Sequence, residues 1–245
     1  QLPHEFFYKA CLENNIELPP EGGYGTGLIF LPRNKKDYNF CKNLFSEIVC
    51  REGQYLLGWR NVPVNDSGIG RTARESEPLI EQVFIARSKG DPSAYRPQDQ
   101  ENSSNFLDFE RRLYVIRKQV ENTIRASNIK QKTYFYITNL SSRTFSYKGL
   151  LMPSQLGDFF LDLKDDGLKS AICLVHSRYS TNTFPAWNLS QPFRFLAHNG
   201  EINTLHGNIN WMRARQGMLK SKVFGEDLKK IMPIIVPDGS DSATL

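Results

Sequence analysis

The sequence lacks any long uninterrupted apolar run. A helix needs about 20 consecutive apolar residues to span a bilayer, and no stretch of the 245 residues approaches that length. No signal or transit peptide, internal repeat or low-complexity segment is visible either. These absences exclude a membrane-spanning protein, a collagen-like repeat, a coiled coil and a disordered tail.

Cysteine is scarce, and the chain contains only Cys11, Cys41, Cys50 and Cys173. None belongs to a CxxC pair and no Cys/His spacing is typical of zinc, so we expect no metal site. Free thiols in a reducing compartment are the expectation. Cys173 lies in the apolar run 171–175, which predicts a buried, unreactive thiol on a strand, with its side chain on the face opposite to His176. This pair is therefore rejected as nucleophile and base.

The excess of one charge sign is small, since 31 Lys and Arg oppose 26 Asp and Glu, a net charge of +5. A pI near 9.0 raises the question of nucleic acid. However, the basic residues are scattered, and acids such as Asp37, Glu110 and Asp227 lie beside them. This pattern favours a solvated face of mixed charge over a phosphate-binding patch, so we expect no nucleic-acid partner.

What is present is an ordinary globular composition, with 40% hydrophobic and 23% charged residues. A chain of this length can bury a substantial core, and we expect one domain over residues 1–245. The sequence starts at Gln1 without an initiator Met and stops at Leu245 without a tail-like composition. We therefore expect a domain that is cut from a longer chain at both ends.

Hydrophobic patterning predicts both helices and strands. Apolar residues at three- and four-residue spacing indicate helices at 36–52, 106–126 and 202–212. Gly53 is expected to end the first helix, and Ser104 or Asn105 to cap the second. Apolar, β-branched and aromatic runs indicate strands at 25–32, 55–60, 82–87, 133–138, 142–148, 169–175 and 193–198. Because strict βαβ alternation is missing, the pattern predicts mixed α and β layers.

Candidate chemistry gathers in the C-terminal third. Arg178 follows the predicted strand 169–175 and precedes the hydrogen-bonding side chains of Ser180, Thr181 and Asn182. A guanidinium is a planar fork that binds a carboxylate through two hydrogen bonds. Arg178 with Thr181 is therefore a candidate carboxylate clamp, and a structural salt bridge is the alternative for a lone arginine at a strand end.

Two further segments offer polar groups to a ligand. Asn199 and Gly200 follow the predicted strand 193–198, and an Asn side chain with a backbone N–H can form an oxyanion hole. The alternative is a plain Asn-Gly turn. Asp241 can accept hydrogen bonds from an ammonium group, or it can form a loop turn. His206 lies in the third predicted helix, where a structural role is expected.

Three longer motifs are more specific than these local patterns. Residues 176–185 read His-Ser-Arg-Tyr-Ser-Thr-Asn-Thr-Phe-Pro, residues 196–205 read Leu-Ala-His-Asn-Gly-Glu-Ile-Asn-Thr-Leu, and residues 207–212 read Gly-Asn-Ile-Asn-Trp-Met. Together with segments 24–32, 147–151 and 239–245, they closely resemble the class II glutamine amidotransferase domain of the glutamate synthases. The resemblance covers essentially the whole chain and is greatest to the single-chain, ferredoxin-dependent branch of cyanobacteria and plastids.

The resemblance implies an α+β fold of the N-terminal nucleophile hydrolase type, with two stacked antiparallel sheets between helical layers in the order αββα. It implies hydrolysis of the glutamine side-chain amide, with the ammonia used at a distant site to convert 2-oxoglutarate to glutamate. Ferredoxin is the implied electron donor. FMN and a 3Fe-4S cluster are the implied cofactors, bound downstream of this domain. The implied location is the plastid stroma or the cytoplasm of a bacterium or cyanobacterium.

The resemblance also implies roles for individual residues. Arg178 would hold the glutamine α-carboxylate, with Thr181 as a further substrate-binding residue. Asn199 and Gly200 would stabilise the tetrahedral oxyanion, and Asp241 would bind the α-ammonium group. These roles are physically consistent. Two neutral groups donate to the developing alkoxide, and one side chain of opposite charge pairs with each of the two charged groups of the amino acid.

One departure from the family concerns the nucleophile. The resemblance implies a cysteine at the mature N-terminus, whose own α-amine serves as the base, whereas this sequence begins with Gln1. That cysteine is expected upstream, and the isolated chain is expected to be inactive. Three alternatives stay open: an NAD(P)H-dependent glutamate synthase, a class II amidotransferase with another acceptor, and a non-catalytic scaffold domain.

Overall fold

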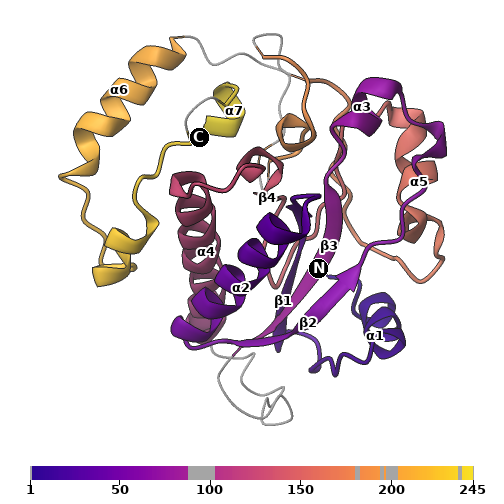
Figure 1. Cartoon of the computed structure of the whole chain (residues 1–245). Coiled ribbons are helices and arrows are strands. Elements are labelled where there is room, and N and C mark those ends of the chain that lie inside the picture. Colours follow the sequence, from indigo (N-terminus) through magenta and orange to yellow (C-terminus); the bar gives the residue numbers. More distant parts are fainter. Residues whose placement is uncertain are drawn as a thin grey trace.

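The structure is a computed structural model that describes residues 2–87, 103–179, 183–193, 196, 204–236 and 239–244 (Figure 1). Its helices are α1 (His4–Glu13), α2 (Lys35–Arg51), α3 (Arg71–Glu75), α4 (Ser103–Ala126), α5 (Leu156–Phe159), α6 (Leu205–Gln216) and α7 (Asp241–Thr244). Its strands are β1 (Tyr24–Leu31), β2 (Tyr55–Asn61), β3 (Leu79–Ala86) and β4 (Tyr136–Ile137). Short 3-10 turns join them at Asp66–Gly68, Lys132–Tyr134, Pro153–Gln155, Leu161–Lys164, Trp187–Leu189 and Gly225–Ile231.

The strands form one four-stranded antiparallel sheet in the order β2-β3-β1-β4. β1 pairs with β3 along its whole length, from Tyr24 opposite Ala86 to Leu31 opposite Leu79. Every residue of β1 is buried. The uninterrupted run of β1 is typical of a strand covered on both faces, and the structure confirms that reading.

Helices α2 and α4 cover one face of the sheet (Figure 1). Their apolar stripes share a buried cluster with the sheet, to which Phe45 of α2 and Leu113 of α4 belong. α2 begins at a cap in which the side chain of Asn34 accepts the backbone N–H of Asp37 at 2.9 Å. Gly53 follows the helix with a φ of 77°, a left-handed conformation that glycine adopts without strain, so the predicted end of this helix is confirmed.

The opposite face carries two further apolar clusters. Phe7 of α1 packs against Phe84 of β3, with ring centroids 5.9 Å apart. Phe159 and Trp187, from the second half of the chain, pack beneath Phe30 of β1. The segment after α5 also runs beside the end of β2, where the backbone N–H of Leu161 donates to the carbonyl of Pro63 at 3.1 Å. The second half of the chain is thereby joined to the sheet.

A buried polar network lies among these clusters. The guanidinium of Arg60 pairs with Asp162, and both side chains are at most 5% exposed. The same guanidinium donates to the side-chain oxygen of Gln82, whose amide donates to Thr26 at 2.9 Å. Tyr147 donates its hydroxyl to Asp162 at 2.8 Å. Buried charges are stable only with such partners, so this network fixes the turn after α5 to the sheet.

The predicted strands near the end of α4 are largely wrong. Only Tyr136–Ile137 of the segment 133–138 forms a strand, and 142–148 forms none. Ser141 and Ser142 instead turn toward α4, where their hydroxyls donate to the carboxylate of Glu110. These contacts, between residues 31 and 32 positions apart in the sequence, take the place of the expected ladder. α4 starts at Ser103, so Ser104 and Asn105 lie inside its first turn rather than at its cap.

The prediction of a buried strand at 169–175 is also wrong. This segment has no strand, and Ile172 and Val175 are 85% and 73% exposed. Cys173 is exposed as well, not buried. A strand needs a partner for its backbone groups, and within the described residues the segment has no ladder. Of the predicted strand at 193–198, Phe193 and Leu196 form an isolated bridge, and the remaining residues lie outside the described residues.

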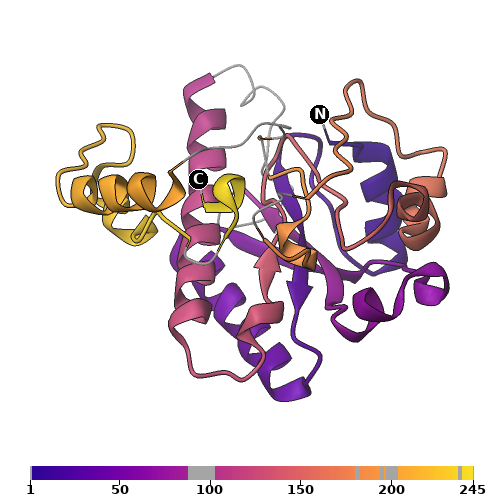
Figure 2. The ribbon, with the colours of Figure 1, turned by 90° about the horizontal axis from the view of Figure 1, so that it is seen from above.

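The described residues therefore contain one antiparallel sheet with helices, and the second sheet of the implied αββα arrangement is not among them. In both views α6 lies beyond α4, away from the sheet (Figure 2). No residue of α6 is buried. Across the part of the chain that the structure describes, no helix combines the length and apolarity required to cross a membrane.

Candidate active site

Arg178 lies on an exposed part of the chain, shortly after the apolar segment 171–175. Its backbone N–H donates to Nδ1 of His176 at 3.1 Å, which gives the backbone a local turn. The Arg178 side chain is exposed, and no described residue is recorded as a partner of its guanidinium. The structural salt bridge considered from the sequence is therefore not formed with any described residue, and the guanidinium is accessible to a carboxylate.

Tyr179 attaches this exposed segment to the core. Its hydroxyl donates to the carbonyl oxygen of Gly149 at 2.9 Å. Burial raises the pKa of Tyr179 to about 12, although a hydrogen bond with Ser190 opposes the rise. The hydroxyl thus stays protonated at neutral pH. The motifs at 147–151 and 176–185 both carried the family resemblance, but nothing in either motif indicated that they touch each other.

Asp241 is the first residue of the short helix α7. The turn before it is compact, because the Ser240 hydroxyl accepts the backbone N–H of Ala243 at 3.3 Å and the Ser240 carbonyl accepts that of Thr244 at 3.0 Å. Ser240 is buried. The backbone of Asp241 is therefore held at a helix start rather than in an irregular loop.

The other predicted site residues lie outside the described residues. These are Thr181, Asn199 and Gly200, and for Asp241 the description covers the backbone only. The structure therefore describes the arginine of the predicted carboxylate clamp, while the oxyanion hole and the ammonium-binding carboxylate stay predictions. The neighbouring Thr204 precedes α6 with a φ of 61°, a left-handed conformation.

The cysteines fall into two environments. Cys11 and Cys41 are buried, and burial raises the pKa of each thiol to about 12. Both are protonated at neutral pH, and a protonated thiol is a poor nucleophile. Cys50 and Cys173 are exposed. No group of three or more His, Cys, Asp or Glu side chains gathers as metal ligands within the described ranges.

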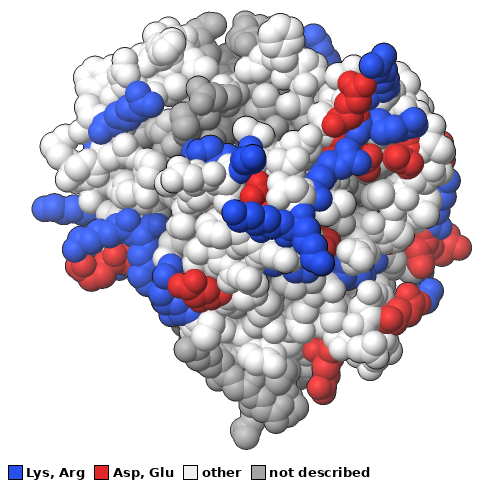
Figure 3. Space-filling view, viewed as in Figure 1, with Lys and Arg blue, Asp and Glu red and all other residues white. Residues whose placement is uncertain are grey.

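Charged side chains of both signs are interspersed on the face shown in Figure 3. Near the end of α2, the buried carboxylate of Glu52 accepts from Arg112 at 2.8 Å and from Lys230 at 3.0 Å. Both cations also pair with Asp227, at 3.0 and 2.7 Å. Basic residues at this place are neutralised by neighbouring acids, in agreement with the predicted face of mixed charge.

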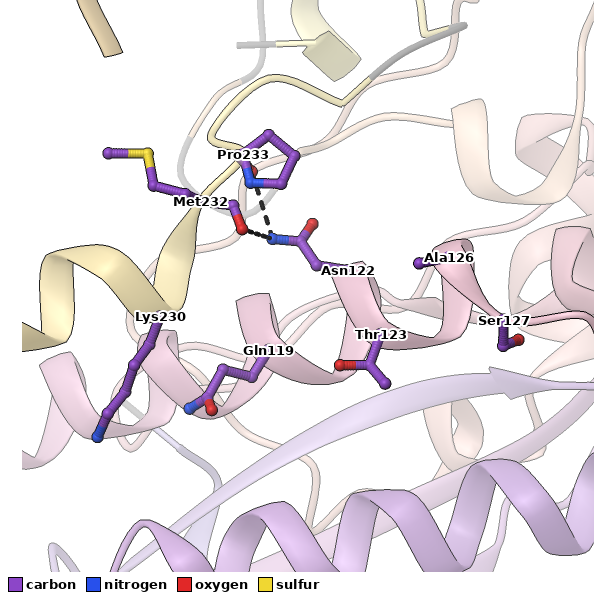
Figure 4. A pocket seen from close by; sticks show the side chains of 8 residues that line it. All are labelled: Gln119, Asn122, Thr123, Ala126, Ser127, Lys230, Met232 and Pro233. Carbon is purple, nitrogen blue, oxygen red and sulfur yellow. Dashed lines mark hydrogen bonds between the residues drawn. The ribbon is translucent and has the colours of Figure 1, made fainter. Parts of the chain in front are cut away.

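A surface groove lies between α4 and residues 230–233 (Figure 4). Asn122 of α4 donates its side-chain N–H to the backbone carbonyls of Met232 at 3.0 Å and Pro233 at 3.3 Å. Lys230 lies at one end of the groove. None of the described residues that line this groove was predicted for the glutamine site. The groove lies where the C-terminal segment packs against α4.

The comparison with protein families assigns the chain to a class. The family of glutamine amidotransferases of class II matches residues 1–245. The chain therefore belongs to the class II glutamine amidotransferases, which have the N-terminal nucleophile hydrolase type of fold. The resemblance found in the three C-terminal motifs is thus confirmed at the level of the family.

Individual relatives narrow the comparison. The chain is 47% identical over 245 residues to the glutamate synthase [NADPH] large chain of Bacillus subtilis and 42% identical over 244 residues to the chloroplastic ferredoxin-dependent glutamate synthase of rice. It is 40% identical over 249 residues to the glutamate synthase [NADH] of Saccharomyces cerevisiae. In each case the whole chain is covered, but it spans only 15%, 14% and 11% of the relative's length.

Proposed function

We propose that this chain is the glutaminase domain of a glutamate synthase, and that all 245 residues form one domain. The observation that carries the proposal is the identity of 40–47% along the whole chain to glutamate synthases from a bacterium, a yeast and a plant. The domain hydrolyses the side-chain amide of glutamine, and the rest of the enzyme uses the ammonia to convert 2-oxoglutarate to glutamate.

In this proposal several residues of the last third of the chain bind the substrate. The Arg178 guanidinium binds the α-carboxylate of glutamine, with Thr181 beside it, and Asp241 binds the α-ammonium group. Asn199 and Gly200 donate hydrogen bonds to the oxyanion that forms when the amide carbonyl is attacked. Arg178 is exposed, and its guanidinium has no partner among the described residues. This exposure supports its role in binding the α-carboxylate.

The attacking thiolate is proposed to come from the N-terminal cysteine that the family resemblance implies, not from the cysteines of this chain. Its sulfur bonds to the amide carbon, the C–N bond breaks and ammonia leaves, and water then releases glutamate. Cys11 and Cys41 are unsuited to this step because burial raises the pKa of each to about 12. We accordingly expect no ammonia release by the 245-residue chain alone, and measurable release would contradict this assignment.

We also propose the αββα arrangement that the family resemblance implies, with the apolar segment 171–175 covered by polypeptide of the same enzyme. The exposure of Ile172 and Val175, at 85% and 73%, supports this proposal. Hydrogen exchange of the whole enzyme tests it: amides of 171–175 should be protected there and unprotected in the isolated chain.

Ferredoxin is the proposed electron donor, and FMN and a 3Fe-4S cluster are the proposed cofactors, held by other parts of the enzyme. NADPH and NADH are the alternative donors, since relatives named for each are similar to this chain. Turnover of the whole enzyme with reduced ferredoxin, NADPH and NADH in parallel decides between them. The proposed location, plastid stroma or bacterial or cyanobacterial cytoplasm, is supported by chloroplastic and bacterial relatives.

The proposal as a whole is tested with amide-¹⁵N glutamine, 2-oxoglutarate and a reductant. The whole enzyme should place the label on the α-amino group of newly formed glutamate. Release of labelled ammonia without labelled glutamate would indicate an amidotransferase with another acceptor. Failure to hydrolyse glutamine would indicate a scaffold domain.

A further inference from the structure

Tyr179 is the anchored residue of an otherwise exposed segment. From Ile172 to Val175 the large apolar side chains are all more than half exposed, and Arg178 is exposed too. Tyr179 is partly buried, and its hydroxyl donates to the carbonyl of Gly149 at 2.9 Å. This long-range hydrogen bond lies one residue from Arg178, and it joins positions that are 30 residues apart in the sequence.

The acceptor of this hydrogen bond is itself held rigidly. A Cβ added to Gly149 would lie 2.6 Å from the indole ring of Trp187, so only glycine fits at this close approach. The indole N–H of Trp187 donates to the carbonyl of Ala73 at 3.0 Å. The Ser190 hydroxyl donates to the Trp187 carbonyl at 2.8 Å, which ties Ser190 to the same indole residue. Gly149, Trp187 and Ser190 thus form one support, which we call the Tyr179 shelf.

We propose that Tyr179 is a positioning residue for glutamine, which presents Arg178 to the substrate's α-carboxylate by holding the adjacent backbone on the Tyr179 shelf. The inference rests on the proposed function, in which Arg178 binds that carboxylate. A bidentate guanidinium contact needs a defined position and plane. The exposed Arg178 side chain has no partner among the described residues that could fix its position. The anchored neighbour, Tyr179, therefore fixes the position of the Arg178 backbone.

The test uses the whole enzyme and the steady-state kinetics of glutamine hydrolysis. Tyr179→Phe keeps the buried ring and removes the hydroxyl. We expect the KM for glutamine to rise about three- to tenfold, the size of one lost hydrogen bond, with kcat nearly unchanged. Ser190→Ala, which leaves the Tyr179–Gly149 bond in place, should raise KM less.

A double-mutant cycle asks whether Tyr179 acts through Arg178. In an Arg178→Ala background, Tyr179→Phe should change KM by less than about twofold, because the group that it positions is gone. Tyr38→Phe is the matched control. Tyr38 lies on α2, is also partly buried, and donates its hydroxyl to the carboxylate of Glu81. The KM for glutamine of the Tyr38→Phe enzyme should stay at the wild-type value.

The outcomes separate this inference from the function on which it rests. If Tyr179→Phe raises KM by the same factor with and without Arg178, or leaves KM unchanged while Arg178→Ala raises it, the inference is wrong and the proposed function stands. A lower kcat at unchanged KM also overturns the inference. If Arg178→Ala itself leaves KM unchanged, the proposed role of Arg178 fails first.

Discussion

The first two thirds of the chain and the last third differ in how their apolar side chains are covered. The described residues up to Leu163 surround the sheet with buried clusters, and the most exposed large apolar side chain among them is Met152, at 59%. Beyond that point Ile172, Phe184 and Trp211 are 85%, 94% and 72% exposed. Several large apolar side chains of the last third are therefore more exposed than any described one in the first two thirds.

This difference separates a region with a buried core from a region whose large apolar side chains are partly exposed. The sheet and its helices bury their own apolar surface, so they carry a core of their own. The motifs proposed to bind glutamine lie in the last third, where the described contacts with the rest of the chain include the hydrogen bonds of Tyr179 to Gly149 and of Asn122 to Met232.

The largest expected effect is on the sheet region. Asp162→Ala leaves the buried guanidinium of Arg60 unpaired, which should lower the free energy of unfolding by about 3–5 kcal/mol in urea denaturation. Glu75→Ala removes one partner of an exposed pair with Arg71, whose side chains are 63% and 90% exposed, and should cost at most about 0.5 kcal/mol. Equal losses would show that the buried network does not hold this region together.

In the last third of the chain, which contains the motifs at 176–185, 196–205 and 207–212, the largest expected effect is on catalysis rather than on stability. Asn199→Ala in the whole enzyme should lower kcat for glutamine about 10²-fold or more, since it removes an oxyanion donor. Asn210→Ala, at an exposed position of α6, is the matched control and should retain the wild-type rate. An unaffected rate in Asn199→Ala would remove that residue from the oxyanion hole.

Arg178→Ala should act on binding. Loss of a charge-assisted contact to the α-carboxylate predicts a glutamine KM raised about 10- to 100-fold, with a smaller change in kcat. Arg213→Ala, also exposed but on α6, should leave KM unchanged. If both substitutions have the same effect, general charge rather than a specific clamp attracts the substrate.

The attachment between the two regions should depend on pH through Glu52. Burial raises the pKa of Glu52, but hydrogen bonds from Gln119, Lys230 and Arg112 outweigh burial, so the pKa lies below its ordinary value of 4.5. A lowered folded-state pKa stabilises the attachment above pH 4.5, and this stabilisation is lost as the pH falls through the folded value.

Hydrogen exchange of residues 225–231 should therefore become faster under acid conditions. Glu52→Gln should already exchange faster at neutral pH and should lose that component of the pH response. An identical acid response in Glu52→Gln would assign the effect to other carboxylates.

The smallest effect is expected for Ile172→Ser in the 245-residue chain, where an 85% exposed side chain contributes little. The free energy of unfolding should change by at most about 0.5 kcal/mol. In the whole enzyme the same substitution should be clearly destabilising, because the side chain is then covered. Equal small effects in both would show that segment 171–175 stays exposed.

Elements with strong periodicity were predictable from the sequence. The helices α2 and α4 and the strands β1, β2 and β3 lie where the patterns indicate them, because each buries one stripe or one continuous run. The strand at 169–175 was predicted from apolar residues alone, and it fails because a strand also needs a hydrogen-bonded neighbour. The strand at 142–148 was predicted from its own residues, and the contact of Ser142 with Glu110, 32 residues away in the sequence, could not be read from them.

The sequence by itself determined the family, the candidate ligand groups and the core helices, because long specific motifs and local periodicity are properties of neighbouring residues. Only the tertiary structure decided which distant residues meet. Tyr179 with Gly149 and Arg60 with Asp162 are separated by 30 and 102 residues. Such pairs are selected by packing and burial rather than by spacing along the chain.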